Sequence, residues 1–289
     1  MKRNMKDFLG KAGAAAFLLV ASTIVLIPVI WMISAAFTKG NLLSSVPLFP
    51  DFKNFTLDHY QYIFSYKSNP ANLFPDYVGA FVRTLSIAVL NTVGVIFFAV
   101  VTGYIFARRR FKGKKQMMLG MMVLQMFPSF MGMLALFLLY RTFGLLRNPN
   151  YLAFIYTAGS IPYNMFLVRG FLRNIPMSLD EAAEIDGASP IQVLYKILLP
   201  LIVPIIGFIG VNAFMAPWLD FILQNAFLQP EQQTVAMWLF RTTDELAPLY
   251  YNPLRFMAGA LLIAIPIMIV QISMQKFMVH GLTSGADKG

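Results

Sequence analysis

The chain of 289 residues contains no cysteine and only two histidines, His59 and His280. The lack of cysteine excludes disulfide bonds, thiol nucleophiles and thiolate metal sites. Both histidines lie outside the long apolar segments, which disfavours a metal site or histidine-based catalysis within the membrane. We therefore predict no catalytic residue, no metal site and no cofactor bound by this chain.

Charged residues are also scarce, at 12% of the chain, where soluble proteins carry about a quarter. Hydrophobic residues make up 58%, and the mean hydropathy is +0.64. This composition is typical of a protein that crosses a membrane many times. At about 20 residues for each span, the length accommodates roughly six spans and no large soluble domain.

A phosphate-binding loop is missing as well. ATP hydrolysis by a P-loop requires the pattern GxxxxGK[ST], which does not occur, and Gly113-Lys114 lacks its spacing. Acidic residues are rare in the apolar segments, where Asp220 is the one candidate, whereas ion-driven transporters commonly place ionisable groups there. A gradient-driven transporter and a membrane enzyme are thus the less favoured alternatives, and any ATPase is expected on a separate polypeptide.

The apolar segments predict an all-α integral membrane protein with six transmembrane helices. We place these spans at residues 12–37, 77–107, 116–140, 151–171, 198–223 and 254–277. Residues 1–76 then hold a basic tail, the first span and an extracytoplasmic loop with a short helix at 57–64. Residues 77–277 form the transmembrane core, and residues 278–289 form a cytoplasmic tail.

Lysine and arginine are unevenly divided between the two sides of this arrangement. Of the 23 bases, 15 fall on the side that holds both termini and eight on the other. Six lie within residues 108–115. Because cytoplasmic loops carry the excess of Lys and Arg, both termini are predicted to be cytoplasmic. The net charge of +10 is explained by this topology, and we predict no binding of nucleic acid.

One polar helical insert, SLDEAAEIDGASPIQVLYKILLPLIVP at residues 178–204, interrupts the apolar segments. Ser178 and Glu181 have the spacing of a capping box, which predicts a helix start, and Gly187 favours a helix end. Ser189 and Gln192 repeat the box around Pro190, so a second helix is expected after a tight corner. An acidic first helix with small alanines suits docking into the cleft of a partner protein, although such a segment can also be a solvated loop.

This insert resembles the EAA loop of the permeases of binding-protein-dependent ABC importers. The matching residues are Glu181, Ala182, Ala183, Asp186, Gly187, Ala188, Ile197, Leu199, Pro200 and Pro204. From residue 77 onward the chain is similar to permease subunits of carbohydrate ABC importers, of the MalG-like maltose/maltodextrin type. The ending GLTSGADKG at residues 281–289 carries the more specific part of that resemblance.

The resemblance implies a type I ABC importer permease of a bacterial cytoplasmic (inner) membrane. Its partners would be a homologous second permease (MalF-like), an ATPase dimer that binds ATP and Mg²⁺, an extracytoplasmic sugar-binding protein and membrane lipid. The EAA loop, at residues 178–200 on the cytoplasmic side of the core, would be the coupling helix. Its ATPase-coupling residues would be Glu181, Ala182, Ala183, Asp186, Gly187 and Ala188. The outer loop at 241–253 would enter the sugar cleft of the binding protein. Related subunits serve galacto- and arabino-oligosaccharides, so maltodextrin is the favoured substrate among several.

Amide, hydroxyl and carboxylate groups in the spans could form part of a sugar path. The candidates are Asn91, Gln125, Tyr163, Asn164 and Asp220, with Phe127, Phe130 and Trp218 as apolar ring faces. In membrane proteins such polar groups more often form hydrogen bonds between helices, and aromatic residues more often simply pack. Each of these residues therefore has both interpretations.

Overall fold

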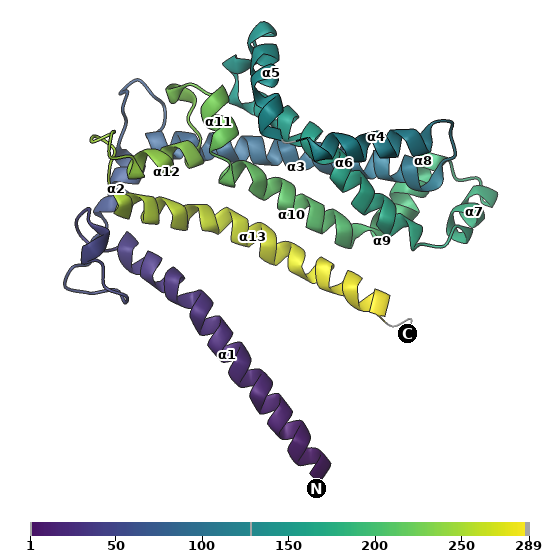
Figure 1. Cartoon of the computed structure of the whole chain (residues 1–289), viewed down its shortest axis with the longest axis horizontal. Coiled ribbons are helices and arrows are strands. Elements are labelled where there is room, and N and C mark those ends of the chain that lie inside the picture. The colour runs from purple at the N-terminus through teal and green to yellow at the C-terminus, as the bar shows by residue number, and fades with distance from the viewer. Residues whose placement is uncertain (1, 128, 287–289) are drawn as a thin grey trace. The chain divides into compact units, whose positions relative to one another are not determined.

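The structure, a computed structural model, describes the backbone of residues 2–127 and 129–286 and the side chains of residues 10–127 and 130–276. Within these ranges every regular element is a helix, and the one strand-like feature is an isolated antiparallel bridge between Thr38 and Phe55. The helices are α1 (Lys2–Ala36), η1 (Leu43–Ser45), α2 (Asp58–Ser65), α3 (Asp76–Arg108), α4 (Lys114–Met126), α5 (Ser129–Thr142), η2 (Leu145–Arg147), η3 (Pro149–Tyr151), α6 (Leu152–Arg173), α7 (Ser178–Ile185), α8 (Pro190–Gln192), η4 (Val193–Leu198), α9 (Leu199–Leu201), α10 (Val203–Leu219), α11 (Ile222–Phe227), η5 (Pro230–Gln232), α12 (Val235–Thr243) and α13 (Pro253–Ala286). The all-α class is therefore confirmed (Figure 1).

Three helical segments among the described residues are long and apolar enough to cross a membrane: Gly10–Ala36, Asp76–Arg108 and Pro253–Lys276. Two bent helix pairs raise the number to five if each pair forms one span. Helix α6, which coincides with the predicted fourth span, is not among them. The sixth span and the cytoplasmic side of the termini thus stay predictions. Helix α13 also continues to Ala286, through most of the predicted tail, and residues 287–289 lie outside the described residues.

The predicted third span is not one straight helix. Helix α4 ends at Met126, α5 follows, and the two are bent by 99°. Phe127 has extended dihedral angles, φ −74° and ψ 130°. The sequence places a proline directly after it, and a residue before proline is disfavoured in helical geometry. The prediction overlooked this break because the segment reads as continuously apolar.

The predicted fifth span is also broken. Residues Pro190–Leu201 form one helical arm that includes a π-helical turn, η4, and Val203–Leu219 form the other, with an angle of 81° between them. Ile202 lies at the break with φ −99° and ψ 8°. Pro204 occupies the first turn of α10, where its missing N–H costs nothing, but in a continuous helix it would remove the bond to the carbonyl of residue 200. The corner and the membrane helix are thus separate arms.

Contacts within the chain divide it into two compact units. One holds the N-terminal segment up to Val78 together with Trp238–Ala264. There His59 Nε2 lies 2.8 Å from the carbonyl oxygen of Thr38, and the hydroxyl of Tyr77 donates to the carbonyl of Gly259 at 2.7 Å. The short helix predicted at 57–64 is confirmed as α2.

The other unit holds Gly79–Met237 and the segment from Ile265 onward. Helices α6 and α10 pack along each other in it (Figure 1), and α3 contacts both of them. The core of this unit buries Val95, Ala99, Val168, Leu172 and Ile209. Glycine permits the closest approach: a Cβ added to Gly103 of α3 would lie 2.6 Å from the side chain of Val168 on α6. This packed group of helices supports both candidate sites described next.

Candidate coupling corner and membrane cavity

The helix-turn-helix at residues 178–192 forms a tight, hydrogen-bonded corner. Gly187 adopts the left-handed conformation, φ +86°. The N–H of Ala188 donates to the carbonyl of Ala183 at 2.9 Å and that of Gly187 to Glu184 at 3.1 Å. These two bonds are those of a Schellman motif, which closes the end of a helix on a glycine. The predicted role of Gly187 as the end of the helix is confirmed.

The start of the second arm also follows its prediction. The N–H of Gln192 donates to the hydroxyl of Ser189 at 3.3 Å, and the N–H of Ser189 donates to Oε1 of Gln192 at 2.7 Å, with Pro190 in the first turn. The first predicted box is wrong: Met177 is the cap residue of α7 and its side chain makes no cap bond. Because Met177 is already helical, with φ −66° and ψ −25°, Ser178 lies inside the helix, where its hydroxyl has no cap role.

The inner side of α7 is held by an ion pair that sequence reasoning missed. Asp180 is buried, and its Oδ2 lies 3.1 Å from Nη2 of Arg108 at the end of α3. The same nitrogen donates to the carbonyl of Ile175 at 3.0 Å. Ala183 is buried beside Asp180 and packs into the core that contains Val193. Arg108 was interpreted only as a topology signal, because nothing local to it points to Asp180.

Two more bases near the end of α3 have structural partners. The guanidinium of Arg109 donates to the hydroxyl of Tyr104 at 3.3 Å, and that hydroxyl donates to the carbonyl of Pro190 in α8 at 3.3 Å. Arg169 of α6 donates to the carbonyl of Phe106 at 3.2 Å. The corner is therefore attached to α3 through both of its arms.

The outer side of the corner is exposed. Glu181, Ala182, Asp186 and Gly187 are open to solvent, whereas Ala183 is buried and Ala188 is half-buried. Two isoleucines stand beside the carboxylates with large exposed fractions, 86% for Ile185 and 73% for Ile191. An exposed apolar patch rimmed by charge is typical of a surface that another protein covers. Four of the six predicted coupling residues are thus available to a partner.

The structure does not bring the predicted substrate-path residues together. Asn91 is fully buried: its amide nitrogen donates to the carbonyl of Ala213 at 2.8 Å, and its oxygen accepts from the hydroxyl of Thr157 at 3.0 Å. Asn164 is buried and donates to Ser160 of its own helix at 2.9 Å. Asn91 therefore makes the hydrogen bonds between helices of the alternative interpretation, whereas the bond of Asn164 lies within α6.

The remaining path candidates differ from one another. Gln125 and Tyr163 are exposed, whereas Asp220 is half-buried just after α10. One oxygen of Asp220 accepts from the hydroxyl of Tyr156 at 2.8 Å, and the other accepts from the N–H of Leu223 at 3.0 Å. Of the five, Asp220 alone belongs to the lining of the cavity described next.

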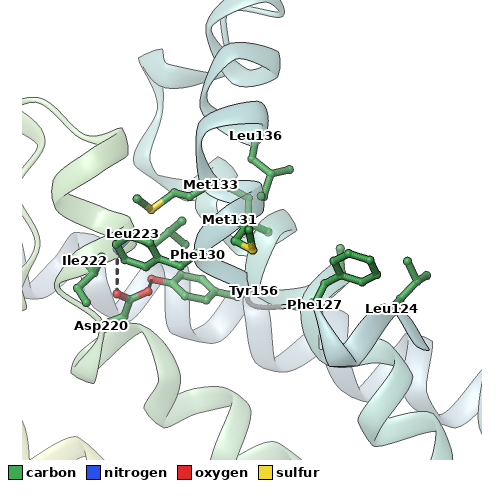
Figure 2. A pocket seen from close by; sticks show the side chains of 14 residues that line it. Leu124, Phe127, Phe130, Met131, Met133, Leu136, Tyr156, Asp220, Ile222 and Leu223 are labelled. Carbon is green, nitrogen blue, oxygen red and sulfur yellow. Dashed lines mark hydrogen bonds between the residues drawn. The ribbon is translucent and has the colours of Figure 1, made fainter. Parts of the chain in front are cut away.

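This cavity has a volume of about 900 Å³ and is bounded by residues of α4, α5, α6 and α11. Figure 2 shows the hydrogen-bonded Tyr156 and Asp220 facing Phe130, Met131 and Met133. The full lining is Leu124, Phe127, Phe130, Met131, Gly132, Met133, Leu136, Ile155, Tyr156, Ala158, Gly159, Asp220, Ile222 and Leu223. Among the described residues, no three His, Asp or Glu side chains meet in a way that could hold a metal ion.

Comparison with known proteins places this architecture in a family. Residues 96–282 match the family described as binding-protein-dependent transport system inner membrane component. The galactooligosaccharides transport system permease protein GanQ of Bacillus subtilis (strain 168) is 36% identical over 277 residues, which cover 95% of each chain. The maltodextrin transport system permease protein MdxG of the same organism is 32% identical over 291 residues, which cover 100% of each.

A solved structure agrees with these relatives. One chain of a bacterial ABC transporter involved in the import of the acidic polysaccharide alginate has a TM-score of 0.70 and 22% identity, covering 94% of this chain and 97% of that chain. At this identity the likeness shows the shared fold. Together with its apolar helices, the family match indicates a multi-pass inner membrane protein. The chain belongs to the family of binding-protein-dependent transport system inner membrane components, among the permease subunits of carbohydrate ABC importers.

Proposed function

We infer that this chain is the non-catalytic permease subunit of an ATP-driven, binding-protein-dependent importer of oligosaccharides. It would form half of the translocation path beside a MalF-like second permease, with an ATPase dimer on the cytoplasmic side that binds ATP and Mg²⁺. An extracytoplasmic binding protein would deliver the sugar. All of these partners are part of the proposal.

The observation that carries the proposal is the exposed face of the corner at residues 178–192. Glu181, Asp186 and the two isoleucines Ile185 and Ile191 are exposed at a place where the chain leaves its apolar helices. A patch of this kind would dock into a groove of the ATPase, with the isoleucines filling apolar pockets and the carboxylates meeting bases at the rim.

The buried contacts of α7 would transmit a movement of the ATPase to the membrane helices. When the ATPase subunits close, their groove would move α7, and the buried pair of Arg108 and Asp180 would carry this movement to α3. The π-helical arm after α8 leads through the break at Ile202 to α10. A rigid corner attached to two membrane helices would thus convert closure of the ATPase into alternating access of the path.

Two substrates are supported by different observations. Maltodextrin is favoured by the resemblance of the sequence to MalG-like subunits and by the relative MdxG, and galactooligosaccharides are supported by the relative GanQ at 36% identity. The transported sugar is therefore a neutral oligosaccharide of one of these two kinds, with maltodextrin favoured.

Uptake into vesicles that hold the complete complex tests the proposal. Labelled maltodextrin should enter only with ATP and the binding protein, and an excess of galactooligosaccharide should leave this uptake unchanged. Competition by galactooligosaccharide would transfer the assignment to the second substrate. Uptake by this chain alone without ATP would favour a gradient-driven transporter. Turnover of a substrate in the absence of all partners would favour a membrane enzyme. If neither sugar were taken up in an ATP-dependent way, the importer itself would be contradicted.

A further inference from the structure

The cavity between α4, α5, α6 and α11 has a chemistry that the coupling mechanism does not use. Its volume of about 900 Å³ lies in the range of ligand sites, about 300 to 1,000 Å³. Most of its lining is apolar, and the rings of Phe127 and Phe130 are exposed in it. The acyl chain of a lipid could occupy such a space, but the polar pair at one end, Tyr156 and Asp220, favours a different ligand (Figure 2).

Asp220 is held as an acceptor of hydrogen bonds. Its two oxygens each accept one bond, from Tyr156 and from the backbone of Leu223. Because a carboxylate offers about four acceptor sites, it can receive further hydroxyl donors from a ligand. A carboxylate in an apolar membrane environment is costly unless it serves a polar partner or pathway. The described lining contains no lysine or arginine, so it offers nothing to neutralise an anionic ligand.

A neutral saccharide suits both the hydrogen-bond acceptor and the aromatic rings of this lining. Its hydroxyl groups donate hydrogen bonds, and the C–H faces of its rings pack on aromatic side chains. We propose that this cavity is a saccharide subsite contributed by this chain, in which Asp220 accepts hydroxyl hydrogen bonds and Phe127 and Phe130 pack on the sugar ring. The same carboxylate repels acidic sugars, so the subsite selects neutral oligosaccharides. This inference rests on the proposed function.

The absence of cysteine allows a direct test in the assembled complex. Met131→Cys places a single thiol of this chain in the cavity, where Met131 is 76% exposed. Met122→Cys is the matched control, because Met122 of α4 is 56% exposed and does not line the cavity. The rate of alkylation by a water-soluble maleimide is read on this chain by mass spectrometry, with and without maltotetraose or galactotriose.

A sugar at ten times its Kd should slow alkylation of Met131→Cys about tenfold, in proportion to the unoccupied fraction, and leave Met122→Cys unchanged. Adding Asp220→Asn should weaken the affinity for the sugar about tenfold, because a hydrogen bond to a charged acceptor becomes one to a neutral acceptor. The same sugar concentration should then slow alkylation only about twofold. Equal alkylation with and without both sugars would overturn the subsite. Protection that survives Asp220→Asn unchanged would overturn the role of the carboxylate.

Filling the cavity gives an independent test. Gly159 lines it and Gly170 does not; both belong to α6, and a Cβ at either would meet no atom within 4 Å. Gly159→Leu should abolish ATP-dependent uptake, whereas Gly170→Leu should retain it. Normal uptake in Gly159→Leu would overturn the subsite while the importer stands. If the complex purified with Gly159→Leu lacked the second permease, the subsite would also be overturned. That result would show that a partner chain, and not a sugar, occupies the cavity. No ATP-dependent uptake by the unmodified complex would instead reject the proposed function.

Discussion

Arg108 at the end of α3 and Asp180 in α7 form a buried ion pair with 3.1 Å between Nη2 and Oδ2. Removing one member of a buried pair leaves the other charge without compensation, which costs about 3 kcal/mol. Asp180→Ala should therefore lower the melting temperature of the purified chain, whereas Glu184→Ala on the exposed side of α7 should change it little.

A double-mutant cycle separates the pair from its surroundings. If the two side chains interact, Arg108→Ala with Asp180→Ala should lose less stability than the sum of the single losses. Strictly additive losses would contradict an interaction between them.

The close contact of α3 with α6 predicts that Gly103 tolerates no side chain. An added Cβ would lie 2.6 Å from Val168 and 3.3 Å from the backbone nitrogen of Arg169, so the helices would have to move apart. Gly103→Ala should destabilise the chain by about 1 to 3 kcal/mol. Gly170→Ala meets no atom within 4 Å and should be neutral or stabilising, because alanine favours a helix more than glycine does. Thermal melting of the two variants tests this prediction. Equal melting temperatures would contradict the close packing of α3 on α6.

The two serines of the corner should differ in their effect. Ser189 accepts the cap hydrogen bond from Gln192, so Ser189→Ala should destabilise the second arm by about 1 kcal/mol. Ser178 makes no cap bond, and Ser178→Ala should have little effect. Hydrogen exchange at the amide of Gln192 measures the opening of the second arm, and exchange at the amide of Glu181 measures that of the first. Faster exchange of Glu181 in Ser178→Ala would show that Ser178 is a cap after all.

Acid should weaken the segment around α2. Burial lowers the pKa of His59 below its ordinary value of 6.5, and Arg255 lowers it further, against the raising effects of the Thr38 carbonyl and Asp58. The folded chain therefore binds fewer protons than the unfolded chain, so this contribution is complete above pH 6.5 and is lost as the pH falls below it. Thermal melting from pH 7.5 to 5.5 should show a fall that is smaller in His59→Gln. If the melting temperature fell equally in the unmodified chain and in His59→Gln, the acid sensitivity would belong to groups other than His59.

Local signals in the sequence predicted most of the helices and the corner, because glycine, proline and capping serines act within a few residues. The apolar runs concealed the breaks at Phe127 and Ile202, since hydropathy averages over proline. The ion pair of Arg108 with Asp180 could not be predicted, because it joins residues far apart in the chain. For the same reason the sequence did not distinguish Asn91, which bonds two neighbouring helices, from Asp220, which lines a cavity.

The corner at Gly187 offers the most direct test of the proposed coupling. Proline cannot adopt the φ of +86° found there and would remove the N–H that bonds Glu184, whereas asparagine enters the left-handed region at low cost. The measurement is the amount of sugar taken up for each ATP hydrolysed, in vesicles that hold the complete complex at equal amounts of inserted chain. We expect Gly187→Pro to lose uptake and Gly187→Asn to keep it. Normal uptake in Gly187→Pro would contradict the coupling role of the corner.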